Sequence, residues 1–130
     1  MSKKYNIAVV GATGAVGKMM IQILLERNFP IKKLYLLASK KSEGKKLKIN
    51  GKEHLIKSLE DFDFKDTDIA LFSAGGEISK KYASVATKNN TIVIDNTSFF
   101  RYEKNIPLII PEVNGDEISK YNETGIIANP

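Results

Sequence analysis

Short apolar runs alternate along this chain with longer segments in which apolar residues recur every three or four positions. The apolar runs predict buried strands over 5–10, 33–38, 68–73, 91–95 and 125–128, and the periodic segments predict helices over 14–28 and 76–89. Residues 47–55 alternate on either side of Asn50-Gly51, a dipeptide that favours a type I′ hairpin. This order predicts a doubly wound α/β fold with a mainly parallel sheet, helices on both faces, and ligands beyond the carboxyl ends of the strands.

Three glycines separate the first predicted strand from the first predicted helix, in the stretch YNIAVVGATGAVG. Gly11, Gly14 and Gly17 fit a Rossmann-type dinucleotide site, where glycines allow a tight exit from the strand, close approach of the pyrophosphate and close helix packing. The helix would point its N–H groups and its positive dipole end at the phosphates. The alternative is a glycine-rich turn that binds nothing. The helix itself is indicated by an apolar side at Val16, Met19, Met20, Ile23 and Leu24.

The end of the second predicted strand bears on the choice of cofactor. Sites that prefer NAD commonly place a carboxylate there, which accepts from the ribose 2′-hydroxyl and would repel a 2′-phosphate. This chain has Ser39, Lys41 and Ser42 instead, a set of hydroxyl and ammonium groups that suits a phosphate. The residues therefore favour NADP. Glu43 is close enough in sequence to oppose that phosphate unless it points away.

Two further strand ends carry small or polar residues. Ser73 and Gly75 belong to a turn of small residues that suits close approach of the cofactor, although a plain tight turn has the same composition. Asn96 and Arg101 follow the strand at 91–95, and a guanidinium near a cofactor site suits a phosphate or carboxylate of the substrate. The alternative for Arg101 is a surface salt bridge.

Composition limits the classes of function. The 130 residues are 42% hydrophobic and 27% charged, which fits one domain over 1–130. There is no cysteine and only one histidine, so neither a disulfide nor a zinc site is expected. The N-terminal apolar run is too short for a signal peptide or a membrane span, which favours a cytoplasmic protein. The net charge of +5 raises the question of nucleic acid, but the clustered lysines lack interleaved aromatic residues and are interpreted as a solvated basic surface; they are Lys40, Lys41, Lys45, Lys46, Lys48 and Lys52.

Several motifs, in order and at similar intervals, resemble those of the aspartate-β-semialdehyde dehydrogenases. They are GATGAVG, ASKKSEGKKL, FSAGG, VIDNTSFFRY, PLIIPEVN and IIANP, and they extend over essentially the whole chain. VIDNTSFFR together with IPEVN separates the chain from the related N-acetylglutamyl-phosphate reductases. The chain is thus similar to the N-terminal NADP-binding domain of the family.

The resemblance implies an NADPH-dependent oxidoreductase that reduces L-aspartyl 4-phosphate to L-aspartate 4-semialdehyde, for lysine, threonine and methionine biosynthesis. It implies a homo-oligomeric parent enzyme whose partner is a small-molecule substrate. It assigns the pyrophosphate to Thr13, Gly14, Ala15 and Val16. It also assigns the 2′-phosphate to Lys41 and Ser42, the nicotinamide side to Gly75, and the substrate phosphate to Arg101. Lys41 stands where the family usually has arginine, which would weaken recognition of the 2′-phosphate because lysine lacks a planar fork.

No catalytic residue is expected within these 130 residues. In the family, IIANP is followed by Asn-Cys, and that cysteine forms a thioacyl intermediate, but this chain ends at Pro130 and has no cysteine. The family's C-terminal catalytic and dimerisation domain is also absent. We therefore expect an inactive cofactor-binding fragment of such an enzyme; the alternative is a stand-alone dinucleotide-binding module without catalysis.

Overall fold

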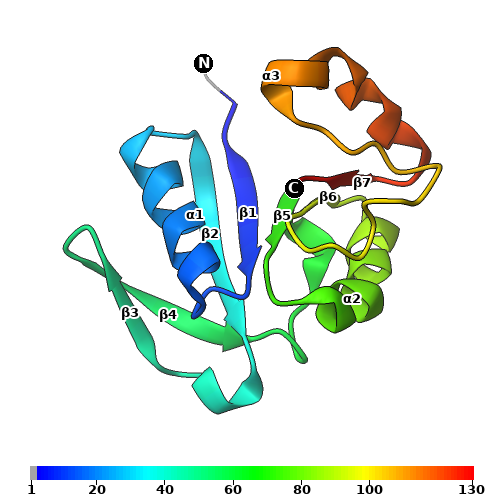
Figure 1. Ribbon diagram of the computed structural model, residues 1–130. Coiled ribbons are helices and arrows are strands. Elements are labelled where there is room, and N and C mark those ends of the chain that lie inside the picture. The colour runs from blue at the N-terminus through cyan, green and yellow to red at the C-terminus, as the bar shows by residue number, and fades with distance from the viewer. Residues whose placement is uncertain (1–2) are drawn as a thin grey trace.

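The computed structural model describes residues 3–130, which form one seven-stranded sheet with the strand order β3-β4-β2-β1-β5-β6-β7 (Figure 1). Only the β3–β4 pair is antiparallel among the strand pairs of the described residues. The predicted doubly wound α/β fold is therefore confirmed. The strands are β1 Tyr5–Val10, β2 Ile31–Ala38, β3 Lys46–Ile49, β4 Lys52–Ser58, β5 Ile69–Phe72, β6 Ile92–Asp95 and β7 Ile126–Ala128. The helices are α1 Ala15–Glu26, α2 Gly76–Lys88 and α3 Pro111–Asn114, with 3₁₀ turns η1 Lys40–Ser42, η2 Phe64–Asp66 and η3 Gly115–Glu123.

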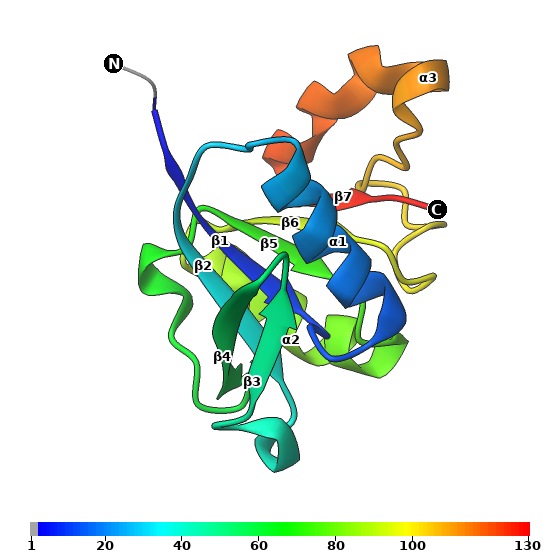
Figure 2. The same ribbon diagram turned by 90° about the vertical axis from the view of Figure 1, so that its left-hand side faces the viewer.

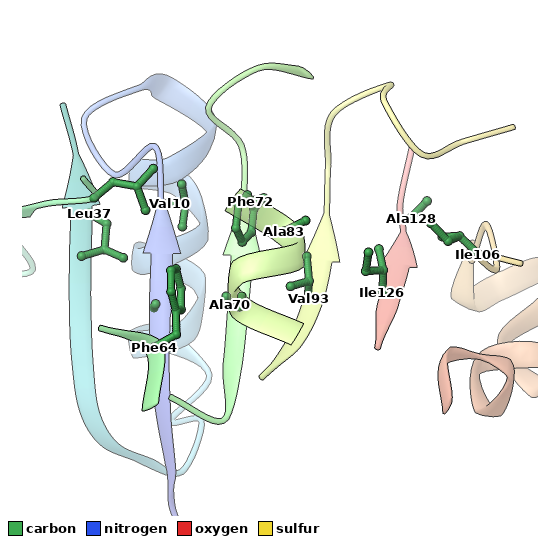
Figure 3. Close-up of a cluster of buried hydrophobic side chains, with 13 residues drawn as sticks. Val10, Leu37, Phe64, Ala70, Phe72, Ala83, Val93, Ile106, Ile126 and Ala128 are labelled. Atoms are coloured by element: carbon green, nitrogen blue, oxygen red, sulfur yellow. The ribbon is translucent and has the colours of Figure 1, made fainter. Parts of the chain in front are cut away.

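The two longer helices lie on opposite faces of the sheet, α1 in front and α2 behind in Figure 2. Each face has its own apolar cluster. On the α1 side, Ile21 of the helix packs with Val9 and Leu36. On the α2 side, Ala83 and Ala86 pack with Phe72 and Val93 in a larger cluster that reaches Ile106 (Figure 3). β1 lies at the centre of the sheet, and residues 7–10 are buried from both sides, which explains the apolar run at these four positions.

The buried face of α1 differs from the apolar side that the sequence pattern predicts. Val16, Met19 and Ile23 are exposed, at 47%, 52% and 39% of their surface, while Gly17 and Ile21 are buried. The cause is the glycine turn: the helix must present Gly17 to the backbone of Gly11 and Ala12, and the residues one turn further along the same face follow it inward. The helix is confirmed, but its predicted apolar side is wrong at these three residues.

The hairpin at Asn50-Gly51 is confirmed, since both residues have positive φ angles, 51° and 78°, as a type I′ turn requires. β4 continues to Ser58, three residues beyond the predicted hairpin, and pairs in parallel with β2 in the register Ala38↔Ser58. The hairpin therefore extends the main sheet beyond β2. This pairing places the segment after β4 beside the segment after β2.

Residues 96–125 contain little that the apolar pattern predicts. α3 and η3 lie there, and Asn114 connects them to the sheet: its side chain accepts from the N–H of Ile110 at 2.8 Å and donates to the carbonyl of Leu108 at 2.8 Å. Leu108 forms an isolated parallel bridge with Ala128 of β7, so the segment borders the edge of the sheet. None of the helices within residues 3–130 is long and apolar enough to cross a membrane.

Candidate cofactor site

A cavity of about 500 Å³ opens at the carboxyl ends of β1, β2 and β5. It lies where the chain leaves β1 toward one face of the sheet and β5 toward the other, the position at which doubly wound folds bind ligands. The lining combines backbone-rich turns with a few polar and apolar side chains. It consists of Val10, Gly11, Thr13, Gly14, Ala38, Ser39, Lys40, Leu59, Glu60, Ser73, Ala74, Ile78 and Tyr82.

The glycine turn is fixed between the two neighbouring strands. The N–H groups of Gly11 and Ala12 both donate to the carbonyl of Leu37, at 2.9 and 3.1 Å. Gly11 has a φ of +94°, and a Cβ there would lie 3.0 Å from the backbone of Ser73 and Ala74. Glycine is therefore required at position 11 both by conformation and by the close approach of the segment after β5.

Gly17 is surrounded by protein atoms, whereas Gly14 borders open space. A Cβ on Gly17 would collide with the carbonyl oxygen of Gly11 and lie 2.8 Å from its carbonyl carbon, so this glycine lets α1 approach the turn. A Cβ on Gly14 would meet only that same oxygen, at 3.6 Å, an ordinary contact. Protein atoms therefore do not fill the space around Gly14. Gly14 lines the cavity, so this space is available to a ligand.

The amino end of α1 suits an anion. Gly14 is its N-cap residue, no side chain caps the helix, and its first turn has no acidic residue. The positive end of the helix dipole is therefore not neutralised by the protein itself. Thr13 and Gly14 line the cavity, whereas Ala15 and Val16 are exposed residues of the first turn outside the lining. These are the chemical features of a pyrophosphate cradle.

The exit of β5 forms the opposite wall. The Ser73 hydroxyl and its N–H both donate to the carbonyl of Val10, at 3.3 and 2.9 Å, which holds the ends of β1 and β5 together. Gly75 caps α2 with a φ of +95° but is not in the lining. Ile78 and Tyr82 of α2 add an apolar side to the cavity.

The exit of β6 is held by a buried polar network. Asp95 is fully buried; its Oδ1 accepts from the Ser79 hydroxyl and from the N–H of Thr97, both at 2.9 Å. Its Oδ2 accepts from the Thr97 hydroxyl at 2.9 Å. The network connects α2 to the turn that follows β6, and that turn carries the predicted substrate residues.

Arg101 and Asn96 are neighbours, but neither lines the cavity. Arg101 Nη2 donates to the carbonyl of Asn96 at 3.2 Å, and its Nε is buried without a hydrogen-bond partner among residues 3–130. Arg101 takes no part in the ion pairs found within those residues, so the structure offers no salt bridge as its role. Its partly buried guanidinium keeps donors that the described residues do not use.

The semialdehyde dehydrogenase family, in its NAD-binding domain, matches residues 6–121. The chain belongs to this family. Aspartate-semialdehyde dehydrogenase 2 of Vibrio cholerae serotype O1 is 52% identical over 130 residues, 100% of this chain and 39% of that protein. The aspartate-semialdehyde dehydrogenase of Campylobacter jejuni is 50% identical over 132 residues, 100% of this chain and 38% of that protein. The chain therefore spans about 39% of the length of the curated relatives that it matches.

Solved structures of the family have the same fold. Vibrio cholerae aspartate semialdehyde dehydrogenase II complexed with ASA matches with a TM-score of 0.94 at 51% identity, over 98% of this chain and 42% of that chain. Aspartate semialdehyde dehydrogenase with NADP from Candida albicans matches with a TM-score of 0.75 at 21% identity, over 97% of this chain and 42% of that one, and shows the fold alone. The cavity of this semialdehyde dehydrogenase domain thus lies in a fold shared by proteins of that name.

The charged part of the semialdehyde dehydrogenase cavity includes a lysine that the sequence prediction did not name among the cofactor residues. Ser39 and Lys40 line it, whereas Lys41 and Ser42, the next two residues of η1, do not. Glu43 is not in this lining but in that of a neighbouring hollow, which it shares with Asp61.

A carboxylate that the sequence prediction missed lines the same part of the cavity. Glu60 follows β4, whose last residue pairs with Ala38 of β2, and the N–H of Leu59 donates to the Ala38 carbonyl at 2.9 Å. Only the parallel pairing of β4 with β2 brings this residue to the site, and nothing in the local apolar pattern indicates it.

Proposed function

We propose that this chain binds NADPH as the cofactor-binding domain of an enzyme that reduces L-aspartyl 4-phosphate to L-aspartate 4-semialdehyde. The observation that carries the proposal is the cavity at the ends of β1, β2 and β5, with the glycine turn on one side and Ser39 and Lys40 on the other. The relatives bear the name of that activity, one solved relative holds ASA and another holds NADP. The reaction belongs to the biosynthesis of lysine, threonine and methionine.

The residues present fit a dinucleotide. The space beside Gly14 and the uncapped amino end of α1 suit the pyrophosphate, and Ser39 and Lys40 supply a hydroxyl and an ammonium for the 2′-phosphate. When bound, the reduced nicotinamide supplies a hydride. Ser73 and Gly75 lie where the cofactor would continue toward the β5 exit, on the nicotinamide side.

We assign the substrate phosphate to Arg101, with Asn96 as its support. Asn96 orients the guanidinium through its carbonyl, and Arg101 takes part in no ion pair among residues 3–130, so its positive charge is available to a substrate phosphate. Formation of a thioacyl intermediate needs a thiolate, and the 130 residues contain no cysteine. The chain by itself is therefore proposed to bind cofactor without turning over substrate.

The test is the substitution Gly14→Asp, with dinucleotide affinity measured by calorimetry. Aspartate is a favoured N-cap residue, and the extended backbone of Gly14 accommodates it, so α1 keeps or gains stability. Its carboxylate would repel the pyrophosphate, and we expect NADPH affinity to fall roughly tenfold or more. Unchanged NADPH binding in a folded Gly14→Asp variant, or no NADPH binding by the wild type, would contradict the proposed site.

A further inference from the structure

The segments that leave β2 and β4 meet at the edge of the cavity with opposite charges. Lys40 follows β2, and Glu60 and Asp61 follow β4. The register Ala38↔Ser58 and the hydrogen bond from Leu59 to Ala38 fix these two exits side by side. The juxtaposition follows from sheet pairing and does not depend on flexible side chains.

Asp61 would compete with a cofactor 2′-phosphate for Lys40, the lysine of this cavity. Lys40 Nζ lies 3.5 Å from Asp61 Oδ2, and both side chains are exposed, at 64% and 57%. Of the described residues that line the cavity, Lys40 is the single cation and Glu60 the single anion. A 2′-phosphate that binds beside Ser39 would therefore compete with Asp61 for Lys40 and lie in the same cavity as Glu60.

The two carboxylates favour a cofactor without a 2′-phosphate. A carboxylate near the end of the second strand accepts from the ribose 2′-hydroxyl of NADH and repels the 2′-phosphate of NADPH. Glu60 occupies such a position although it comes from a different strand. The cation and hydroxyl from the β2 exit and the carboxylates from the β4 exit thus act in opposite directions.

We propose that Asp61 and Glu60 are the residues that set cofactor specificity in this domain, by restraining Lys40 and by accepting from the ribose 2′-hydroxyl. The inference rests on the proposed function of the cavity. The result is a site that takes both NADPH and NADH, with affinities that differ by about tenfold or less, because the opposing groups are exposed and each acts weakly.

The experiment measures the affinity of the chain for NADPH and for NADH in Asp61→Asn, Glu60→Gln and Lys40→Met. Asp61→Asn frees Lys40, so we expect NADPH affinity to rise about two- to fivefold while NADH changes little. Glu60→Gln should lower the affinity for NADH and raise the affinity for NADPH. Lys40→Met should lower NADPH affinity and leave NADH affinity unchanged. These changes should shrink at high salt, because exposed charges are screened.

Glu43→Gln is the matched control. It removes one negative charge from the same region, but among residues 3–130 Glu43 forms no ion pair with Lys40 and does not line the cavity, so the NADPH to NADH ratio should stay at the wild-type value. An Asp61→Asn variant with the wild-type ratio would overturn the assignment of specificity and leave the dinucleotide site intact. A wild-type chain that binds neither dinucleotide would overturn the proposed function and this inference together.

Discussion

The exits of β1 and β6 are held by buried contacts, whereas the exits of β2 and β4 carry exposed charges. At the β1 exit, Gly17 is buried against Gly11, and at the β6 exit Asp95 is buried among three hydrogen-bond donors. At the β2 and β4 exits, Lys40 and Asp61 are more than half exposed. The same edge of one sheet thus combines a rigid frame with a surface of loosely held charges.

This difference separates the parts of the site that fix shape from the parts that choose the ligand. Substitution of a close-packed, desolvated group removes the whole contribution of its contacts to the free energy of folding, because neighbouring atoms cannot move into its place. A change in an exposed ion pair costs little, because water replaces the lost partner. Substitutions at the buried exits should therefore alter stability, and those at the exposed exits should alter ligand preference.

Gly17→Ala tests the rigid side of this comparison and should have the largest effect on stability. Its Cβ would collide with the carbonyl of Gly11, so either α1 or the turn must shift. We expect a loss of about 3 kcal/mol in the free energy of unfolding, the upper end for an overpacked site, measured by urea denaturation. Gly14→Asp, the variant designed to weaken dinucleotide binding, is the matched comparison, because it alters the same turn and should retain the stability of the wild type. Equal loss of stability in both variants would contradict the separation.

Asp95→Ala tests the second buried exit. It leaves the Ser79 hydroxyl and the Thr97 N–H without their acceptor, and we expect a loss of about 1–3 kcal/mol by urea denaturation. Ser79→Ala is the milder control, because Asp95 keeps both bonds from Thr97, and it should cost about 1 kcal/mol. If Asp95→Ala were no more destabilising than Ser79→Ala, the buried network would not hold the β6 exit.

The sequence could predict the frame of the fold because its elements are locally encoded. The apolar run of β1, the helical repeats and the Asn50-Gly51 turn each have a short-range physical cause, and all are found in the structure. The position of the site followed from the same logic, since parallel strands bring their carboxyl ends to one edge. Gly11, Thr13, Gly14, Ser39 and Ser73 accordingly meet at one cavity.

The remaining features depend on non-local packing. The buried face of α1 is chosen by the contact between Gly17 and Gly11, which an apolar count does not include. Glu60 reaches the cavity because β4 pairs with β2, and the local pattern of apolar residues does not predict which strands pair. α3 has only four residues, too short to show a helical repeat, and Asn114 stabilises its position through bonds to Leu108 and Ile110.

Glu117→Gln should have the smallest effect on stability, and it measures how much one exposed ion pair contributes. The hydrogen bonds that Glu117 accepts from Lys120, at 2.7 Å, and from Asn114 hold the pKa of its carboxyl below the usual 4.5. Because the pKa is lower in the folded state, this interaction stabilises the fold fully above pH 4.5, and the contribution is lost as the pH falls through the folded value.

The variant should therefore be slightly less stable than the wild type at pH 7, and the difference should vanish in acid. Urea midpoints of both proteins at pH 7 and at pH 3 provide the measurement, with Asp95→Ala alongside at pH 7. The exposed pair should shift the pH 7 midpoint much less than loss of the buried Asp95 network, because solvent screens Glu117 and Lys120 but does not reach Asp95. A shift as large as that of Asp95→Ala would mean that exposure does not separate the two kinds of contact in this domain.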